Sequence, residues 1–313
     1  MLQRMSDAIQ PLKNAGAKLG ASLSANLGAL SDPTRDRAAI AMIDCRDWTN
    51  PRTYTHGEID EAANAVARAL SARGLARGAS VAILSANRAE FWIAYLGIMR
   101  AGLIAVPVNH KFPRETIAFV LSDSGTRFAF CDHERRAGLD PSLPILDFDE
   151  PGAWGKFLDH GPFDPVTPAP RETAMILYTS GTTGRPKGVP LSHDGQGWAV
   201  RMRLRGGPYD RERLIVAAPL FHMNALGTCK FAAAAHASVT LLPQFDAKRY
   251  LEAIERFKVT WLTSVPTMLA MCARESATIA STDLRSVKFA RMGSAEWDVL
   301  RTQFRDDLAK AAE

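Results

Sequence analysis

Cysteines and long apolar runs are scarce in this chain of 313 residues. The 4 cysteines, Cys45, Cys131, Cys229 and Cys272, lie far apart and form no Cys-x-x-Cys pair. The sequence therefore supports neither a disulfide framework nor a cysteine metal site, and a reducing compartment such as the cytoplasm is the expected location. No apolar run approaches the roughly 20 residues that a membrane-spanning helix needs.

Charge of one sign is not concentrated anywhere, since no block of five like charges occurs. The chain has 38 Lys and Arg residues against 33 Asp and Glu residues, which gives a net charge of +5. This small, dispersed basic excess suits an anionic small ligand such as a nucleotide, and it argues against nucleic acid as a partner. With 47% hydrophobic and 23% charged residues, the composition is that of an ordinary globular protein.

The first 32 residues show an amphipathic pattern. Apolar residues recur from Leu2 to Leu30 at spacings of mostly three, four or seven, which predicts a helix over residues 1–32. The pattern is compatible with a transit peptide or with contact between residues 1–30 and a membrane surface. Docking on the protein itself or on a partner is the preferred interpretation, because Gly16, Gly20 and Gly28 each weaken an isolated helix by roughly 1 kcal/mol.

Short apolar runs alternate with amphipathic stretches along the rest of the chain. This alternation predicts an α/β fold, with a mainly parallel sheet covered by helices on both faces. Thr55 and Glu58 have the spacing of a capping box and predict the start of the first of these helices. The expected strands are 81–84, 104–106, 128–131, 175–178, 214–217, 239–242 and 261–263, and the expected helices are 58–72, 90–100, 114–121, 196–204, 247–257 and 267–274.

Proline concentrates in one region, with seven prolines between residues 141 and 170. A segment of this composition is typical of a connection between folded units. We therefore predict a first α/β lobe at 33–150, a connection at 151–172 and a second α/β lobe at 173–313.

The most informative segment of the chain is Tyr-Thr-Ser-Gly-Thr-Thr-Gly-Arg-Pro-Lys-Gly at residues 178–188. Its glycines allow a ligand to approach the backbone closely, and its hydroxyls and single ammonium can bind phosphate oxygens. It differs from a Walker A loop, because the lysine stands between Pro186 and Gly188. A flexible linker would need neither the lysine nor the apolar run before it. The candidate nucleotide-binding residues are Thr179, Ser180, Gly181, Thr182, Thr183, Gly184 and Lys187.

The apolar run at 174–179 leads directly into this segment. Ligands of open α/β sheets bind outside the carboxyl ends of the strands. Because the glycine-rich segment follows this predicted strand directly, we expect it at the carboxyl end of the strand, where a nucleotide would bind.

This segment resembles the phosphate-binding signature of adenylate-forming enzymes, a superfamily of acyl- and aryl-CoA synthetases, luciferases and peptide-synthetase adenylation domains. Further segments match the family's pattern in the same order, at residues 101–109, 123–125, 219–224, 264–268 and 293–295. The resemblance implies an α/β fold with two stacked, mainly parallel sheets and flanking helices, like the large N-terminal domain of acyl-adenylating enzymes but incomplete at the C-terminus.

The resemblance also implies an activity. A carboxylic acid would react with ATP and Mg²⁺ to give an acyl-adenylate and diphosphate, and coenzyme A would then displace AMP. Thr179 would be a ligand of the Mg²⁺ ion. A role in fatty acid metabolism would follow from such a reaction. His222 and Asn224 would border the acyl group, and Gly293, Ser294 and Ala295 would form a wall beside the adenine and the acyl group. Taken alone, a histidine after an apolar run such as His222 is more often part of the core.

The chain departs from the family pattern near its end. Glu296 and Trp297 stand where relatives have proline and a hydrophobic residue. The resemblance places the magnesium-binding glutamate, the ribose-binding aspartate and the catalytic lysine beyond residue 313, so no catalytic residue is assigned and the C-terminal catalytic domain is expected to be absent.

Two hypotheses stay open at this point. The chain is either a truncated acid–thiol ligase, with a separately encoded C-terminal part as its partner, or a non-catalytic remnant that binds nucleotide or acyl ligand. Another adenylating enzyme of the superfamily is a further alternative. The second hypothesis predicts negligible ATP–pyrophosphate exchange by the isolated chain and self-association through an exposed apolar face.

Overall fold

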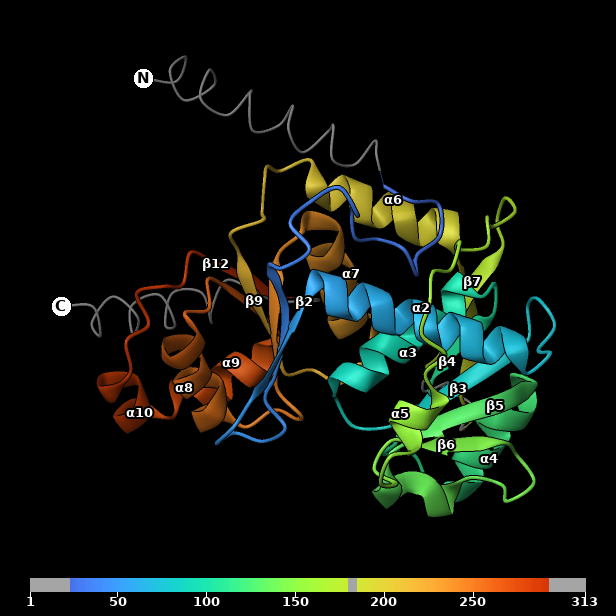
Figure 1. The fold of residues 1–313 in the computed structure, drawn as a ribbon. Coiled ribbons are helices and arrows are strands. Elements are labelled where there is room, and N and C mark those ends of the chain that lie inside the picture. Colours follow the sequence, from blue (N-terminus) through green and yellow to red (C-terminus); the bar gives the residue numbers. More distant parts are fainter. Residues whose placement is uncertain (1–22, 180–184, 293–313) are drawn as a thin grey trace.

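The computed structural model describes residues 23–179 and 185–292, which form two six-stranded sheets with helices on both sides of each (Figure 1). In the first sheet the order is β12 (Phe289–Met292), β11 (Trp261–Ser264), β9 (Arg213–Val216), β10 (Ser238–Leu241), β1 (Ile40–Asp44) and β2 (Arg52–Thr55). In the second it is β6 (Ile145–Asp147), β5 (Thr126–Cys131), β3 (Ser80–Leu84), β4 (Ile104–Pro107), β7 (Thr173–Thr179) and β8 (Lys187–Ser192).

All strand pairs are parallel except β1 with β2 and β7 with β8. The expected α/β fold with two mainly parallel sheets is therefore confirmed.

The helices divide into three layers. Those between the sheets contribute to one large core, which also contains the inward-facing side chains of both sheets. They are α2 (His56–Ala72), α3 (Ala89–Arg100), α6 (His193–Leu204) and α7 (Met223–Ala235). The outer face of the first sheet is covered by α8 (Ala247–Phe257), α9 (Pro266–Ala273) and α10 (Ser276–Ser281), and that of the second by α4 (Arg114–Asp123). The short helix α5 (Ala153–Phe157) lies beside β6, and the short helix η1 (His133–Gly138) lies beside α4.

Strand β3 shows why continuous apolar runs form the centre of these sheets. Val81 and Ile83 point into the core between the sheets, whereas Ala82 and Leu84 point into the core under α4. Side chains alternate between the two faces of a strand, so a strand buried on both faces must be apolar throughout. Helix α2, which precedes β3 in the chain, also begins as predicted. Thr55 Oγ1 accepts from the Glu58 amide at 3.1 Å, and Glu58 Oε2 accepts from the Thr55 amide at 2.7 Å.

The sheets do not divide the chain into the two lobes that the sequence suggests. The early strand β1 pairs with β10 in the first sheet, and β7 and β8 join the second sheet through β4. The proline-rich segment packs into the core between the sheets and is not merely a connection, because Phe157 in α5 packs against Phe130 of β5. An apolar pattern identifies a strand but carries no information about its distant pairing partner, which explains the difference.

The helix predicted for residues 1–32 does not include residues 23–32, which form turns and irregular structure. The Asn26 side chain accepts from the Gly28 amide at 2.8 Å and donates to Met99 O at 2.9 Å. Such local side-chain bonds compete with helix formation. A Cβ at Gly28 would lie 2.4 Å from Leu96 O, so the backbone needs glycine to approach α3 this closely. Leu27 is fully buried, while the prediction for residues 1–22 lies outside the described residues.

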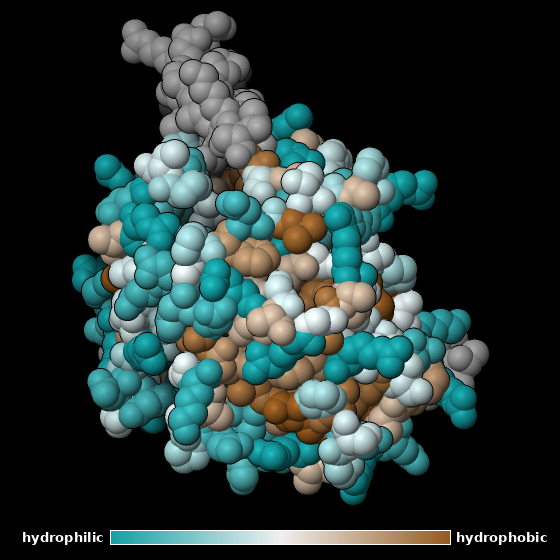
Figure 2. All heavy atoms as spheres, turned by 45° about the vertical axis from the view of Figure 1, so that its right-hand side comes forward, coloured by the Kyte–Doolittle hydropathy of each residue, from teal (hydrophilic) through white to brown (hydrophobic). Residues whose placement is uncertain are grey.

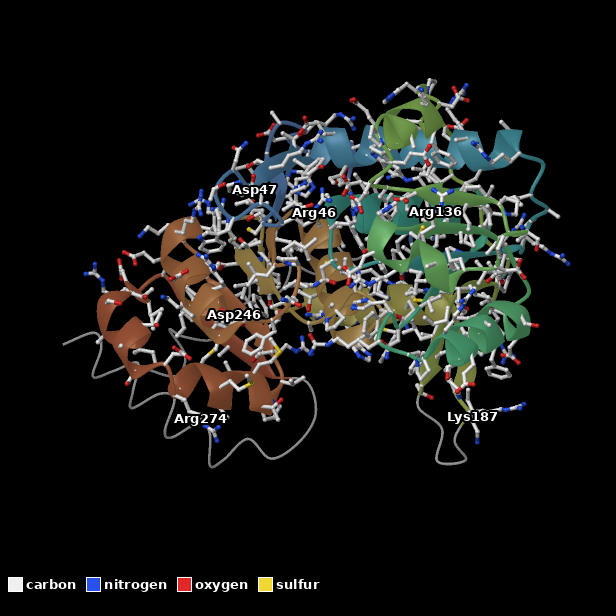
Figure 3. The ribbon with its side chains drawn as sticks, turned by 90° about the horizontal axis from the view of Figure 1, so that it is seen from below. Arg46, Asp47, Arg136, Lys187, Asp246 and Arg274 are labelled. Carbon is white, nitrogen blue, oxygen red and sulfur yellow. The ribbon has the colours of Figure 1, made fainter. Side chains whose placement is uncertain are left out.

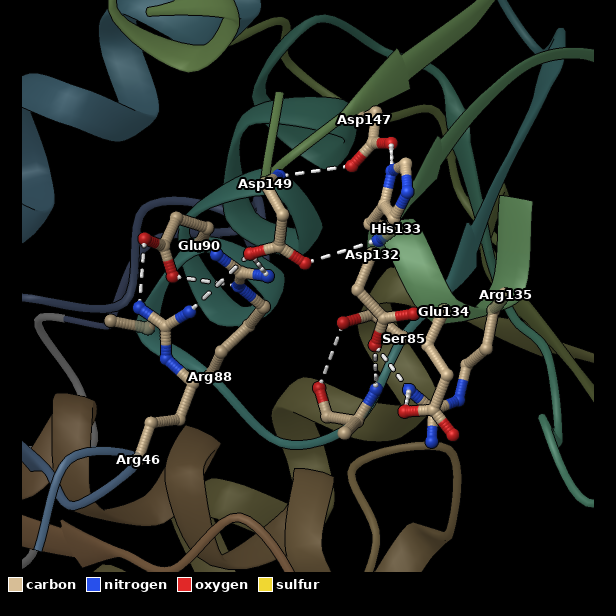
Figure 4. Close-up of polar contacts among 12 residues, drawn as sticks. Arg46, Ser85, Arg88, Glu90, Asp132, His133, Glu134, Arg135, Asp147 and Asp149 are labelled. Carbon is tan, nitrogen blue, oxygen red and sulfur yellow. Dashed lines mark hydrogen bonds and ion pairs between the residues drawn. The ribbon is translucent and has the colours of Figure 1, made fainter. Parts of the chain in front are cut away.

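An ion-pair network joins the two sheets (Figure 4). Arg46, just after β1, contacts Asp44 and Glu90, each at 3.2 Å. Arg88 contacts Glu90 at 3.0 Å and Asp149, which follows β6, at 2.7 Å. Burial opposes the charged form of Glu90, but the bonds from Arg88 and the charge of Arg46 outweigh it and lower the pKa of this carboxyl. The network therefore links the end of β1 to the second sheet, and the lowered pKa keeps the Glu90 carboxylate charged within it.

Apolar side chains gather in the middle of the face shown in Figure 2, with hydrophilic side chains around them. The large apolar side chains that are exposed in the described part of the chain stand on different elements, and they are Ile40, Val189, Trp198, Met223, Met271 and Phe289. None of the helices within the described residues is both long and apolar enough to cross a membrane.

Candidate functional site

The glycine-rich segment belongs to an antiparallel hairpin at the carboxyl end of β7. Thr179 is the register partner of Lys187, and Tyr178 is the partner of Gly188. Both Thr179 and Lys187 are exposed, and Lys187 lies at the outer end of the hairpin (Figure 3). Two of the predicted phosphate-binding groups are thus brought together, as a hydroxyl and an ammonium on facing strands. The predictions for residues 180–184 lie outside the described residues.

The outer part of this hairpin, next to Thr179 and Lys187, is held by contacts to α4. The Tyr178 hydroxyl donates to Asp123 Oδ2 at 2.6 Å, and burial together with this carboxylate raises the pKa of Tyr178. A Cβ at Gly188 would lie 3.0 Å from Tyr178 Cζ, so the glycine lets the ring lie against the facing strand. The guanidinium of Arg185 lies 5.5 Å from the centre of the Phe119 ring. Sequence analysis noted residues 123–125 only as a family segment, and the structure shows that Asp123 positions the hairpin.

Helix α6 connects the hairpin to the rest of the site. Ser192 caps it by accepting from the Gly195 amide at 3.2 Å, and His193 is its first residue. His193 is buried, and its Nδ1 accepts from the Leu27 amide at 3.1 Å. Burial lowers the pKa of His193 to about 4.

This depressed pKa leads to a prediction about stability. The unfolded chain binds the proton of this histidine more tightly than the folded chain does. The contribution of His193 to folding stability is therefore fully present above about pH 6.5, and it falls by about 1.4 kcal/mol per pH unit down to about pH 4. In His193→Asn, the Asn oxygen keeps an acceptor for the Leu27 amide but cannot be protonated, so its loss of stability on acidification should be shallower. Urea titrations of both proteins at pH 7 and about pH 5 measure the difference. The buried His56 contributes equally to both profiles, and parallel profiles would contradict the prediction.

The segment 217–224 lies at the junction of the two sheets. The side chain of Asn87, which follows β3, accepts from the Leu220 amide at 2.7 Å and donates to Ala218 O and Leu242 O at 3.0 Å each. Asn87 is buried, and these bonds fix the segment on the carboxyl ends of strands from both sheets. Sequence analysis missed Asn87, since nothing in the local sequence marks it.

His222 is the residue before α7 and is exposed. Although the residue is exposed, neighbouring atoms keep part of the water away from the ring, and this desolvation and the positive charge of Lys111, which follows β4, lower the pKa of His222, so its ring is neutral at pH 7. Its exposure differs from the core position that a histidine after an apolar run most often has. Asn224, in the first turn of α7, lines a cavity, and the two predicted substrate-binding residues thus lie on the same turn of chain.

This cavity has a volume of about 410 Å³ and lies between α6, α7 and the ends of β11 and β12. It is within the usual size range for small-molecule sites. Its described lining also contains Arg203, Lys230 and Arg291, which sequence analysis did not single out. The one signal in the sequence that could have indicated this cavity is Lys230, a lysine within the apolar run of α7. Gly293, Ser294 and Ala295 follow β12 and lie outside the described residues.

Across residues 23–179 and 185–292, no cluster of three or more His, Cys, Asp or Glu side chains is placed to hold a metal ion. The Thr179 hydroxyl alone is a weak ligand, and Mg²⁺ often binds through a few protein oxygens together with phosphate oxygens and water. Thr179 fits that pattern only as one member of such a set.

A family model described as AMP-binding enzyme matches residues 31–310, and the chain belongs to this family. It is 31% identical over 252 residues to the long-chain-fatty-acid–CoA ligase FadD13 of Mycobacterium tuberculosis, covering 75% of this chain and 49% of that ligase. The chain therefore spans about half the length of this relative.

Two solved structures show the same fold. One is the inhibitor-bound N-terminal domain of FACL13 from Mycobacterium tuberculosis, with a TM-score of 0.78 and 26% identity over 90% of this chain and 73% of that one. The other is O-succinylbenzoate coenzyme A synthetase from Bacillus subtilis in complex with AMP, with a TM-score of 0.75 and 28% identity over 90% of this chain and 70% of that one. These similarities establish the acyl-adenylating type of fold.

Proposed function

We propose that this chain provides the nucleotide and acid sites of an ATP-dependent acid–thiol ligase. The observation that carries the proposal is the hairpin in which Thr179 faces Lys187 at the carboxyl end of β7. Membership of the AMP-binding family and similarity to acid–CoA ligases support it. With 4 free cysteines, all buried, we place the protein in the cytoplasm.

In the proposed reaction, a carboxylate oxygen of the acid attacks the α-phosphorus of ATP, and the bond from that phosphorus to the bridging oxygen breaks. The products are an acyl-adenylate and diphosphate. The Lys187 ammonium and the residues of 179–184 would bind the phosphates that leave, where a fixed positive charge stabilises the developing negative charge. The Thr179 hydroxyl would be one oxygen ligand of Mg²⁺ beside the phosphate oxygens.

The thiol of coenzyme A would then attack the acyl carbon, and AMP would leave. Asn224 would lie beside the acid within the cavity, and His222, neutral at pH 7, would border the reacting carboxylate without carrying a charge. We keep Gly293, Ser294 and Ala295 as the proposed wall of the adenine and acyl site. A separately encoded C-terminal part and contact of residues 1–30 with a membrane are also kept as proposals.

Titration with ATP tests the proposed nucleotide site. Wild-type protein should bind ATP saturably, and Lys187→Ala should weaken binding by about 10- to 100-fold, which corresponds to one lost charge-assisted bond. Isothermal titration calorimetry in the presence of Mg²⁺ measures both constants.

The matched control is Lys248→Ala, which removes an exposed lysine of α8. Its affinity for ATP should equal that of the wild type. An equal loss in both variants would show a general charge effect, and absence of saturable binding by the wild type would reject the proposed function.

A further inference from the structure

Lys230 is the most unusual charged side chain of the cavity. It stands in the middle of α7, is only 1% exposed, and donates from Nζ to Gln196 Oε1 of α6 at 2.6 Å. Its other near neighbour is Met223 Sδ at 3.9 Å. A fully buried lysine is rare unless an anion pairs with it, because the loss of hydration is costly.

Two arginines share this cavity with Lys230. Arg203 of α6 donates from Nη1 to Gly227 O at 2.8 Å, and its guanidinium lies 4.5 Å from the centre of the Phe231 ring. Its Nε is buried and has no hydrogen-bond partner within the described residues. Arg291 of β12 adds a third positive charge. None of the described lining residues is acidic.

These positive charges act on one another. Burial and the nearby charge of Arg203 lower the pKa of Lys230 to about 7, while burial and Arg291 lower the pKa of Arg203 to about 10. Like charges held together in a partly buried space destabilise the fold unless a ligand neutralises them. Such a cost is typical of functional sites.

We propose that this cavity binds a second anionic group, a carboxylate or a sulfonate, at the far end of the acid substrate. This substrate class presupposes the function proposed above, in which the first carboxylate reacts with ATP. The Lys230 ammonium and the Arg203 Nε–H would each donate to the second group, and Arg291 would add charge at the open side. Asn224, Thr228 and Thr263 add polar groups to the same lining.

A long alkyl chain would fit this lining poorly. It would further dehydrate Lys230 and would leave the Arg203 Nε–H without an acceptor, a cost that an oxyanion removes. The acid proposed here is therefore short and doubly charged, in contrast to the long-chain fatty acid in the name of the similar ligase from Mycobacterium tuberculosis.

A matched pair of acylsulfamoyl adenosines, which are stable mimics of an acyl-adenylate, tests the proposal. The pentanoyl and glutaryl compounds have the same nucleotide and the same number of acyl carbons, and they differ only in the terminal carboxylate. Wild-type protein should bind the glutaryl compound more tightly. Lys230→Met should weaken glutaryl binding by about 10- to 100-fold and should bind the pentanoyl compound at least as well as the wild type.

Lys248→Met, a loss of charge on the exposed surface of α8, should leave both affinities unchanged. Thermal melts of all variants check folding, and Lys230→Gln provides a polar replacement that should give the same loss for the glutaryl compound. A variant that binds the pentanoyl compound normally is folded at the site, so its weaker glutaryl binding reports the lost charge.

The pH dependence gives a second readout. The charged groups that face Lys230 are Arg203 from α6 and Arg291 from β12, with Cys229 of α7 as the titratable neighbour. The pKa of Lys230 is near 7, so glutaryl affinity should fall as the pH rises from about 6 to about 8 in the wild type and should stay flat in Lys230→Met.

The possible outcomes separate the two proposals. Equal wild-type affinity for both compounds, or equal loss of both in Lys230→Met, would overturn the second anion site while the nucleotide site stands. Failure of the wild type to bind either compound, together with failure to bind ATP, would reject the proposed function itself and the anion site with it.

Discussion

Replacing Asn87 with leucine is expected to lower the free energy of unfolding by about 3 kcal/mol or more. The side chain makes three buried hydrogen bonds, to the Leu220 amide and to the carbonyls of Ala218 and Leu242. Leucine has a similar volume but no polar atoms, so each of these backbone groups would lose its partner at a cost of about 1–3 kcal/mol. Urea denaturation of both proteins measures the difference.

Asn50→Leu is the control, because Asn50 is exposed and its side chain takes part in no buried hydrogen bond among the described residues. Its stability should stay within about 0.5 kcal/mol of the wild type. Asn87→Leu should also bind ATP and acyl-adenylate mimics more weakly, because the segment 217–224 loses its anchor. Wild-type stability of Asn87→Leu would show that water replaces these bonds and that Asn87 does not fix the segment.

Many of the helices and strands could be predicted from the sequence because their signals are local. The run at 81–84 is apolar on both faces of β3, and the Thr55–Glu58 spacing defines the start of α2. The two sheets could not be separated in the same way, because β1 pairs with β10 across 197 positions of the sequence, Met42 being the register partner of Val239. Pairing of this kind depends on the packing of α2 and α3 between the sheets, which no local pattern encodes.

The candidate site was predictable to a similar degree. The residue types of 178–188 predicted a phosphate-binding loop after the strand at 175–178, but not that this loop belongs to an antiparallel hairpin in which Thr179 pairs with Lys187. By contrast, Lys230 and Arg203 are 27 positions apart on α7 and α6, and they meet only because these helices pack together. Their common cavity makes an ordinary lysine into a group with a pKa near 7, a property of the fold rather than of the sequence.

The proline-rich segment shows a third kind of difference. Its prolines predict a connection, yet its aromatic residues anchor it on the second sheet. Phe130 of β5 is fully buried and lies 5.7 Å from Phe148, 6.4 Å from Trp154 and 5.3 Å from Phe157, measured between ring centres. These contacts hold the chain that leads from β6 to β7 and the hairpin.

Phe130→Ala is therefore expected to lower the free energy of unfolding by about 3–5 kcal/mol, since it removes a buried ring and leaves a cavity. Phe130→Leu keeps most of the volume and should cost less than about 1.5 kcal/mol. Denaturant titration measures both, and limited proteolysis should show faster cleavage between residues 151 and 172 in Phe130→Ala than in Phe130→Leu. A loss of stability without faster cleavage there would mean that the segment is held by its backbone bonds, such as that from the Val166 amide to Arg100 O at 2.9 Å, and not by the aromatic cluster.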